Sequence, residues 1–301
     1  MSQPWSPEVT ITASEAKRLI EQQFPPLKPV AITELGKGFD NTVFIVNEQY
    51  VFRFPRKEIA VELLNTENQL LPLLVHDLNI DIPEPIFFGQ ATEAYKWPFT
   101  GYRLVKGKSP GEIKNEVRVR SAESLALFLK KLHQFPVEKA KKAAVPPDRL
   151  NRTNIGKRRD KLIENVKKAA ELQLIDNAQT AFQWIESLKD VELDSRLTLV
   201  HGDCHIRNIL VDENGIISGI IDWGDTHIGH PAIDISIAYS FLPPSGREKF
   251  FQIYGEVSAE TKMAARFFAF YVSVLLALYG HDVKDKRLVS SAKESMKLSL
   301  S

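Results

Sequence analysis

The spacing of apolar residues predicts a helix followed by a sheet in the first third of the chain. Residues 12–15, Thr-Ala-Ser-Glu, have the form of a capping box, and the apolar positions at 16, 19 and 20 would form the buried stripe of a helix that the two prolines at 25–26 end. Apolar residues separated by glycine and asparagine turns between 30 and 52 predict three antiparallel strands. A helix over 62–74 and two further strands at 86–88 and 102–105 complete this part.

Beyond about residue 106 the apolar spacing is mostly helical. Ser121 is placed to cap a helix whose buried stripe ends at Leu132, and helical spacing resumes over 154–189, 233–241 and 247–279. The strands of the first third and the helices of the remainder predict an α+β fold with two lobes. We place the lobes at 1–105, with a small antiparallel sheet, and at 106–301, which is larger and mainly helical.

One predicted β-hairpin in the second lobe has three polar side chains near its ends. Apolar residues at 209–211 and 216–221 flank an Asp-Glu-Asn-Gly turn, and Asn-Gly is a strong short-range hairpin signal. The hairpin would bring Asn208 near Asp222, and the oxygens of both side chains are hard ligands that suit Mg²⁺. Asp203 would then be free to accept a proton from a hydroxyl group, although a solvated turn with nearby carboxylates is the simpler alternative.

The spacing of these three residues is that of a kinase catalytic loop, H-x-D-x-x-x-x-N, with a later metal-binding aspartate. The whole segment, LVHGDCHIRNILVDENGIISGIIDWGD, resembles the aminoglycoside phosphotransferase family of small-molecule kinases, which includes macrolide phosphotransferases. The resemblance implies a protein-kinase-like two-lobe fold, with nucleotide binding in the first lobe and catalysis and acceptor binding in the second. It assigns Asp203 to catalysis, and Asn208 and Asp222 to Mg²⁺.

The family pattern also selects residues of the first lobe. Gly36 and Gly38 lie in LGKGFDNTVF, which resembles the phosphate-side loop, although a tight hairpin turn needs glycine equally well and Asn41 replaces the third glycine of the protein-kinase pattern. Arg53 stands where kinases hold the α- and β-phosphates, with Arg56 and Lys57 as rivals beyond a proline. Glu67 would orient Arg53, unless it is an ordinary surface glutamate.

The segment FTGYRLVKG resembles the strand and hinge that meet the nucleobase through main-chain groups, and this assigns Leu104 and Lys106 to nucleotide binding. His201 and His205 are tempting metal ligands, but with no third soft ligand nearby we expect them to hold the loop by hydrogen bonds. Asp234 is expected to be buried and structural. Asp225 could line the acceptor side or face water, and the sequence does not decide between them.

The composition is that of an ordinary globular protein, with 44% hydrophobic and 26% charged residues. With 39 Lys and Arg against 38 Asp and Glu the net charge is +1, which favours neither nucleic acid nor a membrane as a partner. Cys204 is the single cysteine, so no intrachain disulfide forms, which fits a cytoplasmic protein, and we expect it to pack rather than react. The N-terminal sequence shows no signal peptide, and the apolar segment at 267–279 is too short to span a bilayer.

The resemblance therefore predicts a monomeric enzyme that moves the γ-phosphoryl group of ATP or GTP, with Mg²⁺, to a hydroxyl of a small molecule such as an aminoglycoside-like antibiotic. A macrolide or a small metabolic alcohol is the alternative acceptor, because residues 241–301 hold nine Lys or Arg against six Asp or Glu, a poor match for a polycation. A non-catalytic nucleotide-binding pseudokinase is a further alternative, against which the intact Asp203, Asn208 and Asp222 argue. A protein kinase is disfavoured by the absence of a D-F-G motif.

Overall fold

The computed structural model describes residues 8–38, 40–111 and 113–301. Residues 1–7, which belong to the segment in which we expect no signal peptide, lie outside the described residues. So does Phe39 of the glycine-containing loop. The chain divides into two compact units. The first comprises Met1–Asp77 and Ile82–Val105, and the second comprises Leu78–Asp81 and Lys106–Ser301.

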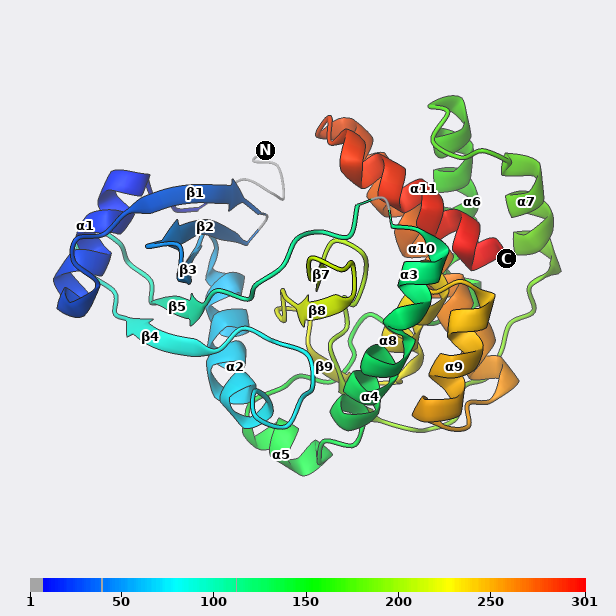
Figure 1. Cartoon of the computed structure of the whole chain (residues 1–301), viewed down its shortest axis with the longest axis horizontal. Helices are drawn as coiled ribbons and strands as arrows, with labels where there is room; N and C mark the ends of the chain where they lie inside the picture. The colour runs from blue at the N-terminus through cyan, green and yellow to red at the C-terminus, as the bar shows by residue number, and fades with distance from the viewer. Residues whose placement is uncertain (1–7, 39, 112) are drawn as a thin grey trace. The chain divides into compact units, whose positions relative to one another are not determined.

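The first unit is an antiparallel five-stranded sheet with two α-helices (Figure 1). The strand order is β1-β2-β3-β5-β4. The elements are α1 (Ala13–Gln23), a 3₁₀ turn (Pro25–Leu27), β1 (Ile32–Lys37), β2 (Asn41–Val46), β3 (Tyr50–Pro55), α2 (Glu58–Leu74), β4 (Pro85–Gly89) and β5 (Phe99–Arg103).

Alternation along the strands gives this sheet two chemically different faces. Phe52 and Phe54 on β3 are buried with Leu19 and Ile20 of α1, so one face of the sheet packs on that helix. Because successive strand residues point to opposite faces, Arg53 between the two phenylalanines projects from the other face. The capping box predicted for α1 is confirmed, since Thr12 Oγ1 accepts the Glu15 N–H and Glu15 accepts the Thr12 N–H.

The second unit is mainly helical and contains two short two-stranded sheets. Its helices are α3 (Asn115–Arg120), α4 (Ala122–His133), α5 (Val137–Lys142), α6 (Ile155–Glu171), α7 (Ala178–Ser187), α8 (Ala232–Phe241), α9 (Pro244–Tyr254), α10 (Ala259–Asp282) and α11 (Lys286–Leu300). The strand pairs are β6 (Thr198–Val200) with β9 (His227–Gly229), and β7 (Ile209–Val211) with β8 (Ile217–Ile220). The predicted hairpin at 209–221 is thus confirmed as β7 and β8.

Three predicted elements differ in detail from the structure. The strand expected at 102–105 is β5, which ends at Arg103 because its partner β3 begins at Tyr50, and the next N–H, that of Leu104, donates to the Gln49 carbonyl in the turn. The helical stretch 154–189 is two helices, α6 and α7. The stretch 247–279 is interrupted where Gly255, at φ +114°, ends α9.

The prediction that Ser121 caps a helix is wrong. Helix α3 leads directly into this position, so the Ser121 backbone is already helical and its hydroxyl makes no cap. The buried Ser121 Oγ instead accepts the N–H of Ile217 at 3.0 Å. The side chain therefore ties the start of α4 to the β7–β8 hairpin.

Helix α10 is longer than its apolar core suggested. By length and composition alone it is able to cross a membrane, so the argument that the segment is too short was wrong. However, 72% of its most apolar window is buried in the fold, and α10 packs against α8 and α11. The expectation that this segment is a buried helix is confirmed.

Candidate functional site

The predicted catalytic loop begins where β6 ends, and its glycine is required by both conformation and space. Gly202 has φ +82°, a region that other residues rarely adopt. A Cβ added there would lie 2.3 Å from the Asp225 carbonyl oxygen and 2.8 Å from His227 Nδ1. The His-Gly-Asp sequence therefore needs glycine so that the loop can turn against the residues preceding β9.

Asp234 of α8 holds the start of this loop. Its carboxylate is fully buried, and it accepts the N–H of His201 at 2.7 Å and that of Gly202 at 2.9 Å. His133 Nε2 of α4 lies 3.1 Å from the same carboxylate. Burial alone would raise the pKa of Asp234, but the hydrogen bond and charge of His133 and the loop donors lower it overall. The structural role expected for Asp234 is confirmed.

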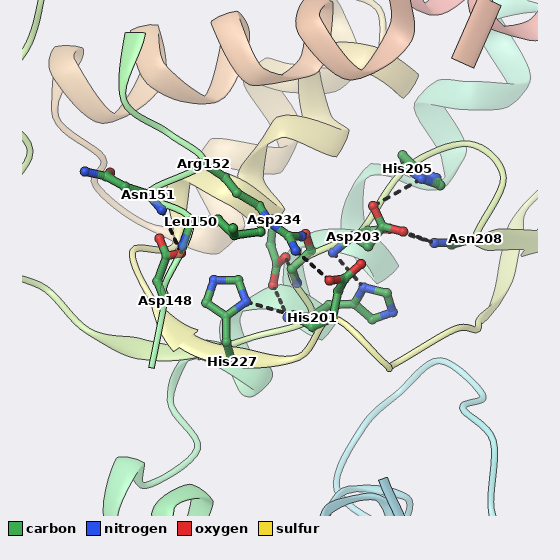
Figure 2. Close-up of polar contacts among 12 residues, drawn as sticks. Asp148, Leu150, Asn151, Arg152, His201, Asp203, His205, Asn208, His227 and Asp234 are labelled. Carbon is green, nitrogen blue, oxygen red and sulfur yellow. Dashed lines mark hydrogen bonds and ion pairs between the residues drawn. The ribbon is translucent and has the colours of Figure 1, made fainter. Parts of the chain in front are cut away.

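Asp203 points toward the far end of the same loop (Figure 2). Asn208 Nδ2 donates to both Asp203 Oδ2 and the Asp203 carbonyl, each at 2.9 Å, and His205 Nε2 lies 3.2 Å from Asp203 Oδ1. Burial raises the pKa of Asp203, but the charge and hydrogen bond of His205, with smaller effects of His201 and Arg152, lower it to about 2. Asp203 is therefore a carboxylate at neutral pH, held in place by two side chains.

The two loop histidines act as hydrogen-bonding residues, as expected. His201 Nδ1 accepts the Asp203 N–H at 3.3 Å, and its Nε2 lies 3.2 Å from the Ile221 carbonyl beyond β8. His205 contacts Asp203 as described above. Cys204 is buried, and burial raises the pKa of its thiol well above the usual value, which confirms the packing role.

The β7–β8 hairpin brings Asn208 next to Asp222 along the main chain, because the Ile221 N–H donates to the Asn208 carbonyl at 2.8 Å. Asp222 has φ +66°, a left-handed conformation that non-glycine residues adopt infrequently and that is often found at functional sites. The contacts of Asn208 with Asp203 use its amide nitrogen, which leaves the oxygen as its potential cation ligand. One carboxylate and one amide oxygen are a suitable donor pair for Mg²⁺.

In the first unit, the predicted partnership of Arg53 and Glu67 is confirmed. Arg53 Nη1 lies 2.8 and 3.0 Å from the two carboxylate oxygens of Glu67 on α2, and Glu67 is buried. Tyr102 of β5 also donates to Glu67, at 2.7 Å, a partner that the sequence analysis missed. Arg53 lies opposite Thr100 in the sheet, and Tyr102, two residues further along β5, points to the same face. Strand alternation could therefore have indicated that Tyr102 lies near Arg53 and Glu67.

The glycine loop is open but not conformationally special. Neither Gly36 nor Gly38 has a positive φ, and a Cβ at Gly36 would meet nothing within 4 Å. The Gly38 N–H donates to the Asn41 carbonyl at 2.9 Å, and the rival cation Arg56 donates to the Gly38 carbonyl. Phosphate binding here stays a prediction.

The two predicted hinge residues are engaged differently. The Leu104 N–H already donates to the carbonyl of Gln49, in the turn before β3, at 2.8 Å, so in this structure it is occupied within the first unit. The Lys106 carbonyl in the second unit accepts the Ser218 hydroxyl at 3.5 Å. Their roles in nucleotide binding also stay predictions.

Arg152 is a site residue that the sequence analysis did not find. Its guanidinium donates to the Gly202 carbonyl at 2.8 Å and to Asp225 Oδ1 at 2.5 Å, and it lies near the loop in Figure 2. The Asp225 carboxylate thus pairs with Arg152 and remains exposed, and whether it also lines the acceptor side stays open. No local motif marks Arg152, because its partners are 50 and 73 residues away.

Comparison with known proteins adds independent findings. The model of the phosphotransferase enzyme family matches residues 31–268. The uncharacterized protein YcbJ of Bacillus subtilis (strain 168) is 24% identical over 105 residues, which are 34% of this chain and 33% of that protein, so the match spans a third of the relative.

Solved structures match over nearly the whole chain. The GDP complex of wild-type aminoglycoside 2'-phosphotransferase-IIIa is 28% identical, with a TM-score of 0.68 over 96% of this chain and 99% of that one. The GDP and kanamycin complex of APH(2")-IIia is 27% identical, with a TM-score of 0.66 over 94% and 97%. Macrolide 2'-phosphotransferase type I, 20% identical with a TM-score of 0.56 over 96% and 98%, shares the fold. The predicted kinase-like α+β fold is confirmed.

Asp234→Asn is expected to destabilise the protein. The asparagine NH₂ group would face one of the two loop N–H groups in place of an accepting oxygen. One buried donor would then lack an acceptor, which should lower the free energy of unfolding by about 1–3 kcal/mol. Urea unfolding measures this. The control is Asp194→Asn, which alters a half-exposed contact with His230 and is expected to cost less than about 1 kcal/mol. Equal losses in the two variants would contradict the assigned role of Asp234.

Proposed function

The chain belongs to the phosphotransferase enzyme family, and on this premise we propose that it transfers the γ-phosphoryl group of ATP or GTP to a hydroxyl group of a small molecule. The observation that carries the proposal is the ionised Asp203, held by Asn208 and His205 in a loop that Asp234 fixes. A carboxylate with this support is suited to orient a hydroxyl for attack on a phosphoryl group.

In the proposed mechanism Asp203 acts mainly by position. With a pKa of about 2, it is a weak base at neutral pH. It therefore accepts a hydrogen bond from the acceptor hydroxyl first, and takes the proton only as the oxygen–phosphorus bond forms and the oxygen becomes acidic. Catalysis on this view is positioning and electrostatic stabilisation, as in other phosphoryl transfers.

Donor binding is proposed for the residues that the family resemblance selects. Arg53, oriented by Glu67, binds the α- and β-phosphates through its planar guanidinium, with the Gly36–Gly38 loop and main-chain groups at Leu104 and Lys106 as the further predicted contacts. Asn208 and Asp222 are the residues that would hold Mg²⁺. When bound, this ion supplies charge neutralisation at the phosphate oxygens.

Family likeness and the charge of the second unit leave the acceptor open among three classes. The kanamycin in one of the similar structures supports an aminoglycoside-like acceptor. The excess of basic over acidic residues in 241–301 supports a less cationic one, such as a macrolide or a small metabolic alcohol. A screen of ATP and GTP consumption across these three classes tests the proposal, and a protein that binds nucleotide but consumes none would be the pseudokinase.

Asp203→Ala and Asp203→Asn are expected to lower turnover by about 10²- to 10⁴-fold, because both remove the carboxylate that orients the hydroxyl. Nucleotide affinity should change little, since Asp203 is assigned to the acceptor. The asparagine variant keeps an oxygen for Asn208 and so controls for loop disorder. Steady-state rates with an established acceptor, together with nucleotide titration, provide the measurement, and a wild-type rate in either variant would rule out this role.

Asp222→Ala is expected to weaken Mg²⁺-dependent nucleotide binding as well as the rate, because it removes the carboxylate assigned to the metal. Binding of labelled nucleotide is measured over a Mg²⁺ titration in the absence of acceptor. Asp212→Ala, in the turn of the same hairpin, is the control. If Asp222→Ala needs no more Mg²⁺ than the wild type, another residue holds the ion.

Arg53→Ala is expected to weaken triphosphate binding, and Arg53→Lys should restore part of it, because lysine keeps the charge but loses the bidentate guanidinium. The affinities for ATP and AMP are compared in each variant. The loss should be larger for ATP, since the predicted contact is with phosphates beyond the first. Equal ATP affinity in all three proteins would transfer the role to Arg56 or Lys57.

A further inference from the structure

A cavity of about 890 Å³ in the second unit shares a wall with the predicted catalytic loop. It is lined by Lys108, by Ile206 and Arg207 of the loop, and by the beginning of α11 with Asp285 before it. Ile206 also lines the small cavity that Asp203 and His205 face. The volume lies in the range of small-molecule sites.

The charged side chains of this cavity are almost all basic. Lys108, Arg207, Lys286 and Arg287 line it, against the single carboxylate of Asp285. That carboxylate is turned to the helix, where it accepts the Leu288 N–H at 3.0 Å as the N-cap of α11. The cavity thus carries an excess of three positive charges, although the whole chain carries only one.

None of these four cations makes an ion pair with a carboxylate in the described part of the chain, although Lys108 also borders a second cavity that Asp81, Asp212 and Glu213 line. All four side chains are exposed, and none of them has a carboxylate partner among the ion pairs of the described residues. Other basic residues of the unit do have such partners, for example Lys293 with Asp176 at 2.7 Å and Lys249 with Glu123 at 3.1 Å. A cluster of unpaired cations repels itself, and a bound anion would relieve that repulsion.

One of the cations is fixed by its neighbours. The Arg207 guanidinium lies 5.0 Å from the ring centroid of Tyr279 on α10, within the range of a cation–π contact. This contact restrains the side chain without neutralising its charge or occupying its hydrogen-bond donors. The first turn of α11 adds the positive end of the helix dipole to the same region.

We propose that this cavity binds an anionic group, a phosphate or a carboxylate, of the acceptor whose hydroxyl meets Asp203. The inference rests on the proposed function and names its acceptor class as a negatively charged hydroxy compound. On this proposal a polycationic aminoglycoside, which would meet three excess like charges here, is not the acceptor. Arginine and lysine at one site suit phosphate and carboxylate alike, so the two groups are separated by experiment.

The first test measures anion binding without catalysis. Inorganic phosphate, and separately acetate, is titrated into the isotope-labelled full-length chain, saturated with Mg²⁺ and a non-hydrolysable ATP analogue so that the donor site is filled. The amides of Lys108, Arg207 and Lys286–Leu288 are followed by NMR. Saturable shifts are expected, and the Arg207→Gln/Arg287→Gln variant should bind on the order of tenfold more weakly.

Two further variants keep this test decisive. Lys108→Gln/Lys286→Gln removes the same charge from the same cavity and should also weaken binding, in case the arginine variant unfolds. Lys167→Gln/Lys168→Gln removes two exposed charges of α6 that line no part of the cavity, and should change affinity less than about twofold. Absence of shifts, or equal affinity in all variants, would overturn the proposal.

The second test follows nucleotide consumption with matched acceptors: a hexose, the hexose 6-phosphate, the corresponding uronic acid, and kanamycin. Preference for the phosphate or the carboxylate compound is expected and tells the two groups apart. Saturable turnover of kanamycin, turnover of neutral compounds only, or phosphate binding without turnover of any anionic compound would each overturn the acceptor assignment. Tighter binding of single-stranded RNA than of phosphate at the same amides would also overturn it, because the cavity would then serve a nucleic acid.

Failure of this proposal is distinguishable from failure of the proposed function. If only the acceptor class is wrong, nucleotide is still consumed with a neutral or cationic acceptor, and Asp203→Ala stops that consumption. If the phosphotransfer itself is wrong, no compound or water supports nucleotide consumption in the wild-type protein, whatever the phosphate titration shows.

Discussion

The buried carboxylate of Asp234 is the constraint on which the catalytic loop depends. A fully buried charge is tolerated only when it is paired and hydrogen-bonded, and here His133 and the N–H groups of His201 and Gly202 provide those partners. Two of the three donors are main-chain N–H groups of the loop itself. The contacts that satisfy the buried charge therefore also fix the backbone just before Asp203. The cost of burying Asp234 is therefore offset by the same contacts that position the site.

The rest of the loop is held by further contacts of its own residues. His201 reaches the main chain beyond β8, and Asn208 ties its own end of the loop to Asp203. Arg152 holds the Gly202 carbonyl from the opposite side. In the first unit, Arg53 is positioned by strand alternation, which puts it on the face of the sheet away from the phenylalanines. There Glu67 forms an ion pair with Arg53, and the Tyr102 hydroxyl donates to Glu67.

What the sequence predicted well was local. The capping box at Thr12 and the Asn-Gly hairpin at 214–215 act over a few residues, and each formed where the pattern placed it. The site residues that the sequence missed, Tyr102 and Arg152, act across 35 to 73 residues, and only the packed fold brings their partners together. Ser121 shows the same limit. Its sequence context fits a helix cap, but α3 precedes it directly, and its hydroxyl accepts the N–H of Ile217, 96 residues away.

The proposed phosphoryl chemistry and the proposed choice of acceptor rest on physically different features of the second unit. Asp203 and Asn208 are joined by a part-buried hydrogen bond, and the loop that carries them is held by the buried bond from the Gly202 N–H to Asp234, where a change of one atom leaves another unsatisfied. The cations of the neighbouring cavity are exposed, and Arg207 lies against the ring of Tyr279. Substitution among such exposed residues usually costs little stability. If the cavity binds the acceptor as proposed, a fold of this kind can keep the same transfer machinery while the charge of that cavity changes, and the charges that line the cavity would then be a better guide to the acceptor than family likeness alone.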